Sequence, residues 1–229
     1  MDTINKVKSI SIWIFIVPFV AINTCLILIT SFHDLFPNKA HIIHFTFPYI
    51  DGGASISRTA RVFPTYLIFK PAMFLTAYLL VRYWLYIKNI ILNIHGEHKN
   101  LRKILIFGIG SAICLVIHSI FLGIKFDYDL YKLFRRVIML VFIIFEVVAQ
   151  AYLVVTLYSI KNKLLSFINL KFLKLKAILV SILVFVMIVS IPIVSMPGNK
   201  HIKHALEWDF FLGVILFYVL TFFMWKKQS

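Results

Sequence analysis

Acidic residues are scarce in this chain. Its 229 residues include 9 Asp and Glu against 24 Lys and Arg, which gives a formal net charge of +15. A charge of this size can indicate nucleic-acid binding, but no motif of a nucleic-acid-binding module accompanies it. The lysines instead cluster beside apolar runs. We therefore expect no nucleic-acid partner, and we interpret the charge as contact with anionic lipid at the cytoplasmic membrane face.

Cysteine is also scarce. The two cysteines, Cys25 and Cys114, fall inside long apolar runs, and we interpret each as a small buried apolar residue. Sequence alone leaves their pairing open. Two histidine pairs, His41 with His44 and His201 with His204, contain a common zinc ligand, but neither a cysteine cluster nor a His-Glu-x-x-His helix accompanies them. We expect no metal and no cofactor.

Apolar sequence is abundant. The chain is 61% hydrophobic with a mean hydropathy of +0.93. Apolar runs recur, each long enough to cross a hydrocarbon core of about 30 Å as a helix, whereas the alternating strands of an outer-membrane barrel are absent. We predict an all-α polytopic membrane bundle forming a single domain, 1–229, with no internal repeat. Its six expected transmembrane helices are 10–32, 62–86, 104–124, 133–160, 178–196 and 206–225.

Basic residues predict the orientation of these spans. They are more frequent in the segments that share a side with the N-terminus, so both termini are expected to be cytoplasmic. The run 10–32 is longer than the apolar core of a signal peptide and lacks a small-x-small cleavage pattern, so we expect a retained first span. The lysine-rich connection 161–176 is either an amphipathic segment that meets anionic lipid or a plain topology signal.

Lys70, His118 and Glu146 are ionisable residues that lie well inside predicted spans. Charges within a membrane are costly, and they commonly mark function. Counting from the outer ends at about 1.5 Å per residue places all three in the outer half or at the midplane. We predict that Lys70 pairs with Glu146, near Gln150 and His118, around a cavity open to the outer leaflet. A purely structural pair that fixes helix register is the alternative.

Helical spacing adds polar groups to this compartment. Offsets of three, four, seven and eleven residues return to one helix face, which in the fourth span carries Arg135, Met139, Phe142, Glu146, Ala149 and Gln150. In the last span, Glu207 and Tyr218 share a face, while Asp209 points elsewhere near the outer entrance. If the protein is catalytic, we expect Glu146, His118 and Glu207 to act as acid or base.

The outer segment 47–70, FPYIDGGASISRTARVFPTYLIFK, concentrates polar residues between the first two spans. Guanidinium groups bind phosphate through paired hydrogen bonds, so its arginines are candidate headgroup ligands. The alternative is that they extend to the membrane interface without a ligand. The predicted lipid-headgroup site comprises Arg58, Arg61, Lys70, Arg135, Arg136, Gln150 and Asp209.

Two stretches carry a family resemblance. FPYIDGG resembles the PYI-S/D-x-G signature that follows the first span in the Frag/DRAM/Sfk family of six-span membrane proteins, and HALEWDFFLGVILFYVLTFFMWK resembles that family's last span. The matching residues are Pro48, Tyr49, Ile50, Gly52 or Gly53, Glu207, Trp208, Leu220, Thr221 and Phe222. Where many members carry a Pro-Glu pair, this chain has Ser57 and Arg58.

The resemblance implies a lipid-linked function. The family includes proteins that remodel the lipid of GPI anchors, autophagy-associated lysosomal members and members that affect plasma-membrane lipid organisation, so it implies no single reaction. We expect an integral membrane protein that binds a lipid or glycolipid headgroup and acts in lipid remodelling or distribution. A non-catalytic adaptor is the alternative. A small-solute transporter is less favoured, because inverted repeats and paired broken helices are absent.

Overall fold

A computed structural model describes residues 2–124, 129–196 and 198–226, and this part of the chain is helical with no β-strand. The long helices are α1 (Asp2–Ser31), α4 (Tyr66–His95), α5 (Leu101–Phe121), α6 (Asp129–Ser159), α8 (Leu170–Ser195) and α9 (Lys200–Met224). The short helices are η1 (His33–Leu35), η2 (Lys39–His41), α2 (Pro48–Asp51), α3 (Ile56–Ala60) and α7 (Lys161–Leu164). The predicted all-α class is confirmed.

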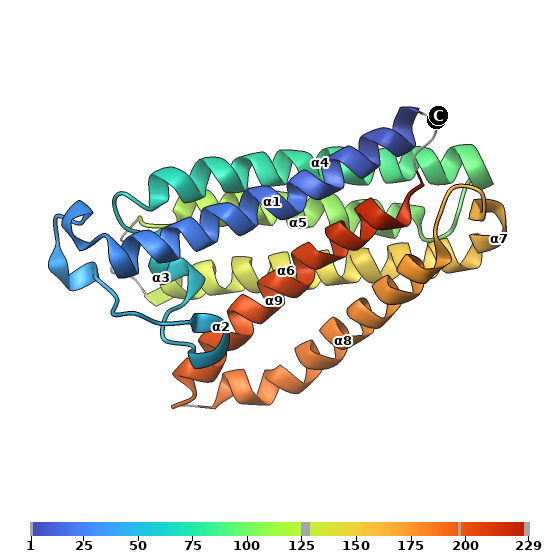
Figure 1. Cartoon of the computed structure of the whole chain (residues 1–229). Coiled ribbons are helices and arrows are strands. Elements are labelled where there is room, and N and C mark those ends of the chain that lie inside the picture. Colours follow the sequence, from blue (N-terminus) through green and yellow to red (C-terminus); the bar gives the residue numbers. More distant parts are fainter. Residues whose placement is uncertain (1, 125–128, 197, 227–229) are drawn as a thin grey trace.

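The long helices pack side by side in a closed ring. Around the ring the neighbours are α1, α4, α5, α6, α8 and α9, and α9 packs back on α1 (Figure 1). The short helices η1, η2, α2 and α3 gather at one end, which we call the loop end. At the opposite end, where α1 begins and α9 ends, Lys8 Nζ donates a hydrogen bond of 3.1 Å to the carbonyl oxygen of Trp225.

Among the described residues, five helices are long and apolar enough to cross a membrane. They contain the stretches Thr3–Ser31, Leu101–Phe121, Leu133–Ser159, Leu170–Ile193 and Lys200–Met224. The chain therefore has the character of an integral multi-pass membrane protein. Large apolar side chains on α8, such as Ile182, Phe185 and Ile188, are exposed, as expected for a helix whose solvent is lipid.

α4 differs from these five helices in composition. It spans thirty residues, as α1 does, but it carries Lys70, Arg82 and Lys88, which lower its hydropathy. It begins at Tyr66 instead of residue 62 and continues past the predicted end to His95. Its place between α1 and α5 is fixed by close packing, since a Cβ added to Gly108 of α5 would lie 2.5 Å from the Trp84 ring.

The lysine-rich connection 161–176 is not one interfacial segment. It divides into α7, a turn and the first residues of α8, where the Asn169 side chain accepts a hydrogen bond of 3.0 Å from the Lys171 amide. The turn is bound to the end of α9, because the Asn169 amide donates to the Met224 carbonyl at 2.8 Å. Elsewhere in the bundle Cys25 and Cys114 are buried and unpaired, as apolar residues would be.

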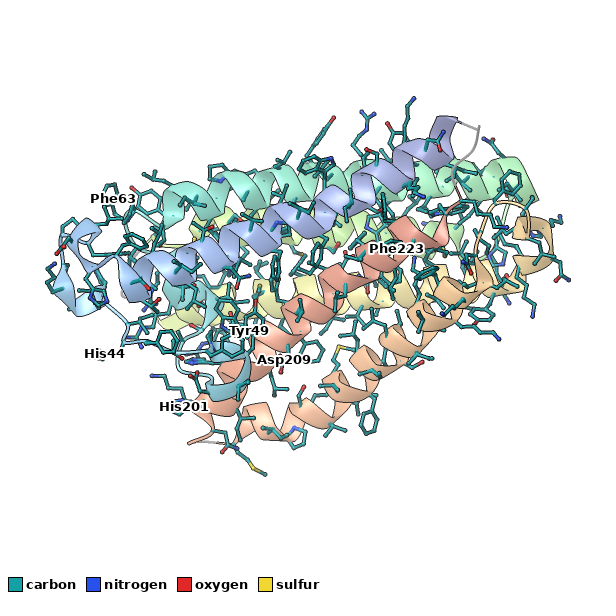
Figure 2. All side chains as sticks on the ribbon, viewed as in Figure 1. His44, Tyr49, Phe63, His201, Asp209 and Phe223 are labelled. Atoms are coloured by element: carbon teal, nitrogen blue, oxygen red, sulfur yellow. The ribbon has the colours of Figure 1, made fainter. Side chains whose placement is uncertain are left out.

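α2 docks on the first turns of α9, which brings the two stretches of the family resemblance into contact. Trp208 Nε1 donates to the Ala54 carbonyl at 2.8 Å, and the Tyr49 ring meets the Trp208 ring edge-on at 4.9 Å. Gly52 has a φ of +59°, and a Cβ there would lie 1.8 Å from the His201 carbonyl oxygen. Glycine is therefore required at position 52. Figure 2 shows Tyr49, His201 and Asp209 together at the loop end.

Candidate functional site

Two adjoining pockets open at the loop end. The first, of about 440 Å³, is lined by Ala40, His41, Ser55, Arg58, Arg61, Val62, Lys200 and His204. The second, of about 500 Å³, is lined by Phe36, Pro37, Asn38, His41, Arg61, Val62, Phe63, Gly123, Ile124 and Arg135. The two share His41, Arg61 and Val62, so we treat them as one feature, the basic pockets. Of the residues expected in the headgroup site, Arg58, Arg61 and Arg135 line these pockets.

The positive charge in the basic pockets is not compensated by their lining. Neither set of lining residues includes Asp or Glu. Partial burial lowers the pKa of the Arg61 guanidinium, and the positive charges of Arg135 and Arg58 lower it further. Like charges held this close favour the binding of an anion, because an anion removes their mutual repulsion.

Beneath α3, inside the helix ring, lies a smaller space of about 60 Å³, which we call the central cavity. Its lining is mostly apolar and comes from α1, α3, α4, α5, α6 and α9. Three ionisable residues line it: His118 from α5, Glu146 from α6 and Glu207 from α9. These are the residues expected to act as acid or base, so the structure brings that set together. Met139 and Phe142 also line the cavity, as the predicted α6 face requires.

Glu146 is fully buried and is satisfied by neutral donors. Ser111 Oγ donates to Oε2 at 2.5 Å, and Gln150 Nε2 donates to Oε1 at 3.2 Å. The Tyr218 hydroxyl also donates to Oε1. A buried carboxyl group without hydrogen bonds would be strongly destabilising, so these three donors explain how Glu146 is tolerated.

The predicted pair of Lys70 with Glu146 is wrong. Lys70 is partly exposed, and its Nζ donates to the Ile120 carbonyl at 3.3 Å while lying 5.8 Å from the centre of the Tyr66 ring. Ile120 is in the last turn of α5, where carbonyls lack helix partners and attract cations. Two residues at the same depth in a bundle need not face each other. On α4, Phe69 and Met73 line the central cavity, whereas Lys70 does not.

Other predicted residues lie outside the pockets. Arg136 and Asp209 are exposed and line none of the three spaces described. Gln150 is buried. Its side-chain amide donates one hydrogen bond to Glu146 and another, of 3.2 Å, to the Val214 carbonyl. His201 and His204 place Nδ1 at 3.2 and 2.9 Å from the carbonyls of Asp51 and Gly52, so they join α9 to the α2 turn. No group of three or more metal-ligating side chains occurs among the described residues.

Sequence reasoning missed Lys176, which it assigned to a cytoplasmic connection. Lys176 is fully buried in α8, donates to Thr221 Oγ1 at 2.8 Å and lies 3.8 Å from the centre of the Phe217 ring. The Tyr83 hydroxyl is 3.4 Å from the same Thr221 oxygen. A signal was present in the sequence: apolar residues at positions 173, 180 and 183 share a helix face with Lys176, and all three are buried.

Comparisons of the chain with protein-family models, with curated proteins and with solved structures find no match. The resemblance to the Frag/DRAM/Sfk family therefore stays a prediction. The structure contributes an independent observation, namely that the loop stretch and the last-helix stretch on which the resemblance rests pack against each other through Tyr49 and Trp208.

Proposed function

We propose that this protein binds the phosphate-bearing headgroup of a membrane lipid or glycolipid at its loop end and acts in lipid remodelling or distribution. The supporting observation is the pair of basic pockets, which Arg58, Arg61, Arg135 and Lys200 line without a carboxylate. Guanidinium groups match phosphate oxygens in geometry as well as charge. Volumes of about 440 and 500 Å³ suit a headgroup and exceed what a bare phosphate needs.

In this proposal α4 is a sixth span and both termini are cytoplasmic. α4 is as long as α1 and closes the ring between α1 and α5. Its arginine at position 82 is exposed and lies 5.1 Å from the Tyr86 ring, an arrangement that suits a membrane interface. An even number of antiparallel spans places the two termini on one side. The loop end then faces the outer leaflet.

The family resemblance supports a lipid as the ligand. The Frag/DRAM/Sfk family includes members that remodel or organise lipids, and one resembling residue of each stretch, Tyr49 and Trp208, forms the α2–α9 contact at the loop end. The central cavity supplies groups capable of proton transfer, Glu146, His118 and Glu207, directly beneath α3. A remodelling reaction would use this set, whereas a distribution function would need only the basic pockets.

Binding of phosphatidylglycerol to the purified full-length protein in detergent tests the proposal, with diacylglycerol of the same acyl chains as the phosphate-free reference. Native mass spectrometry or a fluorescence titration reports the affinity. We expect Arg61→Gln with Arg135→Gln to weaken phosphatidylglycerol binding by about tenfold or more. Arg136→Gln is the matched control, since Arg136 is adjacent in sequence and lines neither pocket. Equal binding of the two lipids, or equal effects of the variants, would contradict the proposal.

A further inference from the structure

Neighbouring residues of two helices line the basic pockets and the central cavity. On α3, Arg58 lines the first basic pocket and its neighbour Ser57 lines the central cavity. On α9, His204 lines the pocket and Glu207, three residues further along, lines the cavity, a rise of about 4.5 Å. A ligand that occupies both spaces therefore needs two polar groups separated by a short spacer.

The α6 side of the site has the same arrangement. Arg135 lines the second basic pocket, and Met139, one turn deeper, lines the cavity. The charge of Arg135 also acts on His118, which places the cationic pocket and the cavity histidine within electrostatic reach of each other. On this side the lining changes from cationic to apolar within one turn, and the acidic residue Glu146 lies about 16 Å along α6 from Arg135.

The ionisable groups of the central cavity are hydrogen-bond acceptors. Its lining includes the carboxyl groups of Glu146 and Glu207 but no Lys or Arg. His118 is only 6% exposed, and its Nδ1 has no hydrogen-bond partner. A neutral imidazole can offer a lone pair at that nitrogen. A bound hydrogen-bond donor would satisfy His118, and a cationic donor would also be attracted by the carboxyl group of Glu207.

The remaining lining fits a small organic cation. Aromatic faces attract ammonium groups, and five aromatic residues border the cavity: Phe69, Phe142, Phe210, Phe211 and Tyr218. The cavity is small, at about 60 Å³. A primary ammonium can donate hydrogen bonds to His118 and Glu207, whereas a trimethylammonium group has no N–H to donate. The additional carboxylate of a serine headgroup would face Glu146 and Glu207.

We infer that the headgroup is an aminoethyl phosphate, with its phosphate in the basic pockets and its primary ammonium in the central cavity against Glu207 and His118. This inference rests on the proposed function and names the lipid class for the same site. The ligand so defined is an ethanolamine phospholipid. Its two-carbon spacer is short, as the neighbouring positions of the lining residues on α3 and α9 require.

A binding series with the purified full-length protein tests this assignment, using phosphatidylethanolamine, phosphatidylcholine, phosphatidylserine and phosphatidylglycerol of identical acyl chains. We expect phosphatidylethanolamine to bind about tenfold more tightly than phosphatidylcholine or phosphatidylserine. Soluble phosphoethanolamine should displace it weakly, and phosphocholine should not displace it. Equal binding of phosphatidylethanolamine and phosphatidylcholine would overturn the inference. Soluble phosphoethanolamine binding as tightly as the lipid would overturn the assignment to a lipid.

Variants test the ammonium site separately from phosphate binding. Glu207→Gln should abolish the preference for phosphatidylethanolamine over phosphatidylcholine while phosphatidylglycerol binding persists. Asp209 is a carboxylate two residues away that lines no described pocket. The control variant Asp209→Asn should therefore keep the preference for phosphatidylethanolamine. A preference unchanged in Glu207→Gln overturns the ammonium site. Arginine-dependent phosphatidylglycerol binding without any preference refutes the ammonium site alone, whereas no binding of either lipid refutes the proposed function too.

Discussion

The loop end and the interior of the bundle handle charge in opposite ways. In the interior, Glu146 and Lys176 are fully buried, and both are bound by hydroxyl groups of α9, Tyr218 and Thr221. At the loop end, by contrast, arginines line open pockets without a carboxylate. Charges that the protein itself satisfies stabilise one packing of the helices, and charges left uncompensated at a surface are free to bind a ligand.

The two interior charges also differ from each other. Glu146 borders the central cavity, whereas Lys176 does not appear in its lining and packs on the Phe217 ring. Glu146 is therefore placed to meet a ligand, and Lys176 is placed to hold α8 on α9. Changes in the interior should accordingly alter global stability, and changes at the loop end should alter local order and binding.

The largest effect is expected from Thr221→Val, which removes the oxygen that accepts from Lys176. A buried ammonium without its acceptor should cost about 2 to 3 kcal/mol of unfolding free energy. Thermal unfolding in detergent, followed by intrinsic fluorescence, measures the loss. The double variant with Lys176→Met should recover most of it, since the charge is then absent. No recovery in the double variant would contradict a stabilising role for this contact.

A medium effect is expected from Gly52→Ala at the loop end. The new Cβ would meet the His201 backbone, so α2 should separate from α9 at a cost of about 1 to 3 kcal/mol. Limited proteolysis between α1 and α4 should then accelerate while the global unfolding temperature changes little. Gly96→Ala is the matched control: Gly96 has a φ of +83° but open space around it, so it reports the backbone strain alone. Equal proteolysis of both variants would argue against the docking contact.

The smallest effect concerns Asp51, an exposed carboxylate in the α2 turn. A hydrogen bond from Thr46 lowers its pKa in the folded state, with smaller contributions from the Gly53 and Phe47 amides. The stabilisation from ionised Asp51 is thus fully present above its unfolded-state pKa of about 4. It is lost as the pH falls through the lower pKa of the folded state. Loop-end proteolysis should increase only slightly on acidification, because solvent screens the group. Asp51→Asn should remove this pH dependence, and an unchanged profile would show that other groups cause it.

Some of the architecture follows from the chain alone. Runs of apolar residues predicted helices at all six positions where long helices lie. Helical spacing correctly placed Met139, Phe142 and Glu146 on one face of α6, and Glu207 with Tyr218 on one face of α9, because all of these residues line the central cavity. Of the seven residues expected in the headgroup site, Arg58, Arg61 and Arg135 line the basic pockets.

Other features depended on contacts between distant segments. Lys70 was expected at Glu146 because the two lie at similar depth, yet Lys70 bonds to the end of α5 and Ser111 occupies one side of the Glu146 carboxyl. Lys176 was counted as a loop cation because lysines surround it in sequence. Lys200 and His204 join the basic pockets only because α2 and α3 fold against the start of α9.

Sequence by itself determined where the long helices lie and which residues of a helix share a face. These properties follow from the apolar pattern and from the fixed rise and turn of a helix. Only the tertiary structure decided which faces meet, because the rotation of each helix depends on the order of its neighbours around the ring. That order gave Glu146 hydroxyl and amide donors, buried Lys176 and left the arginines of the loop end without a carboxylate.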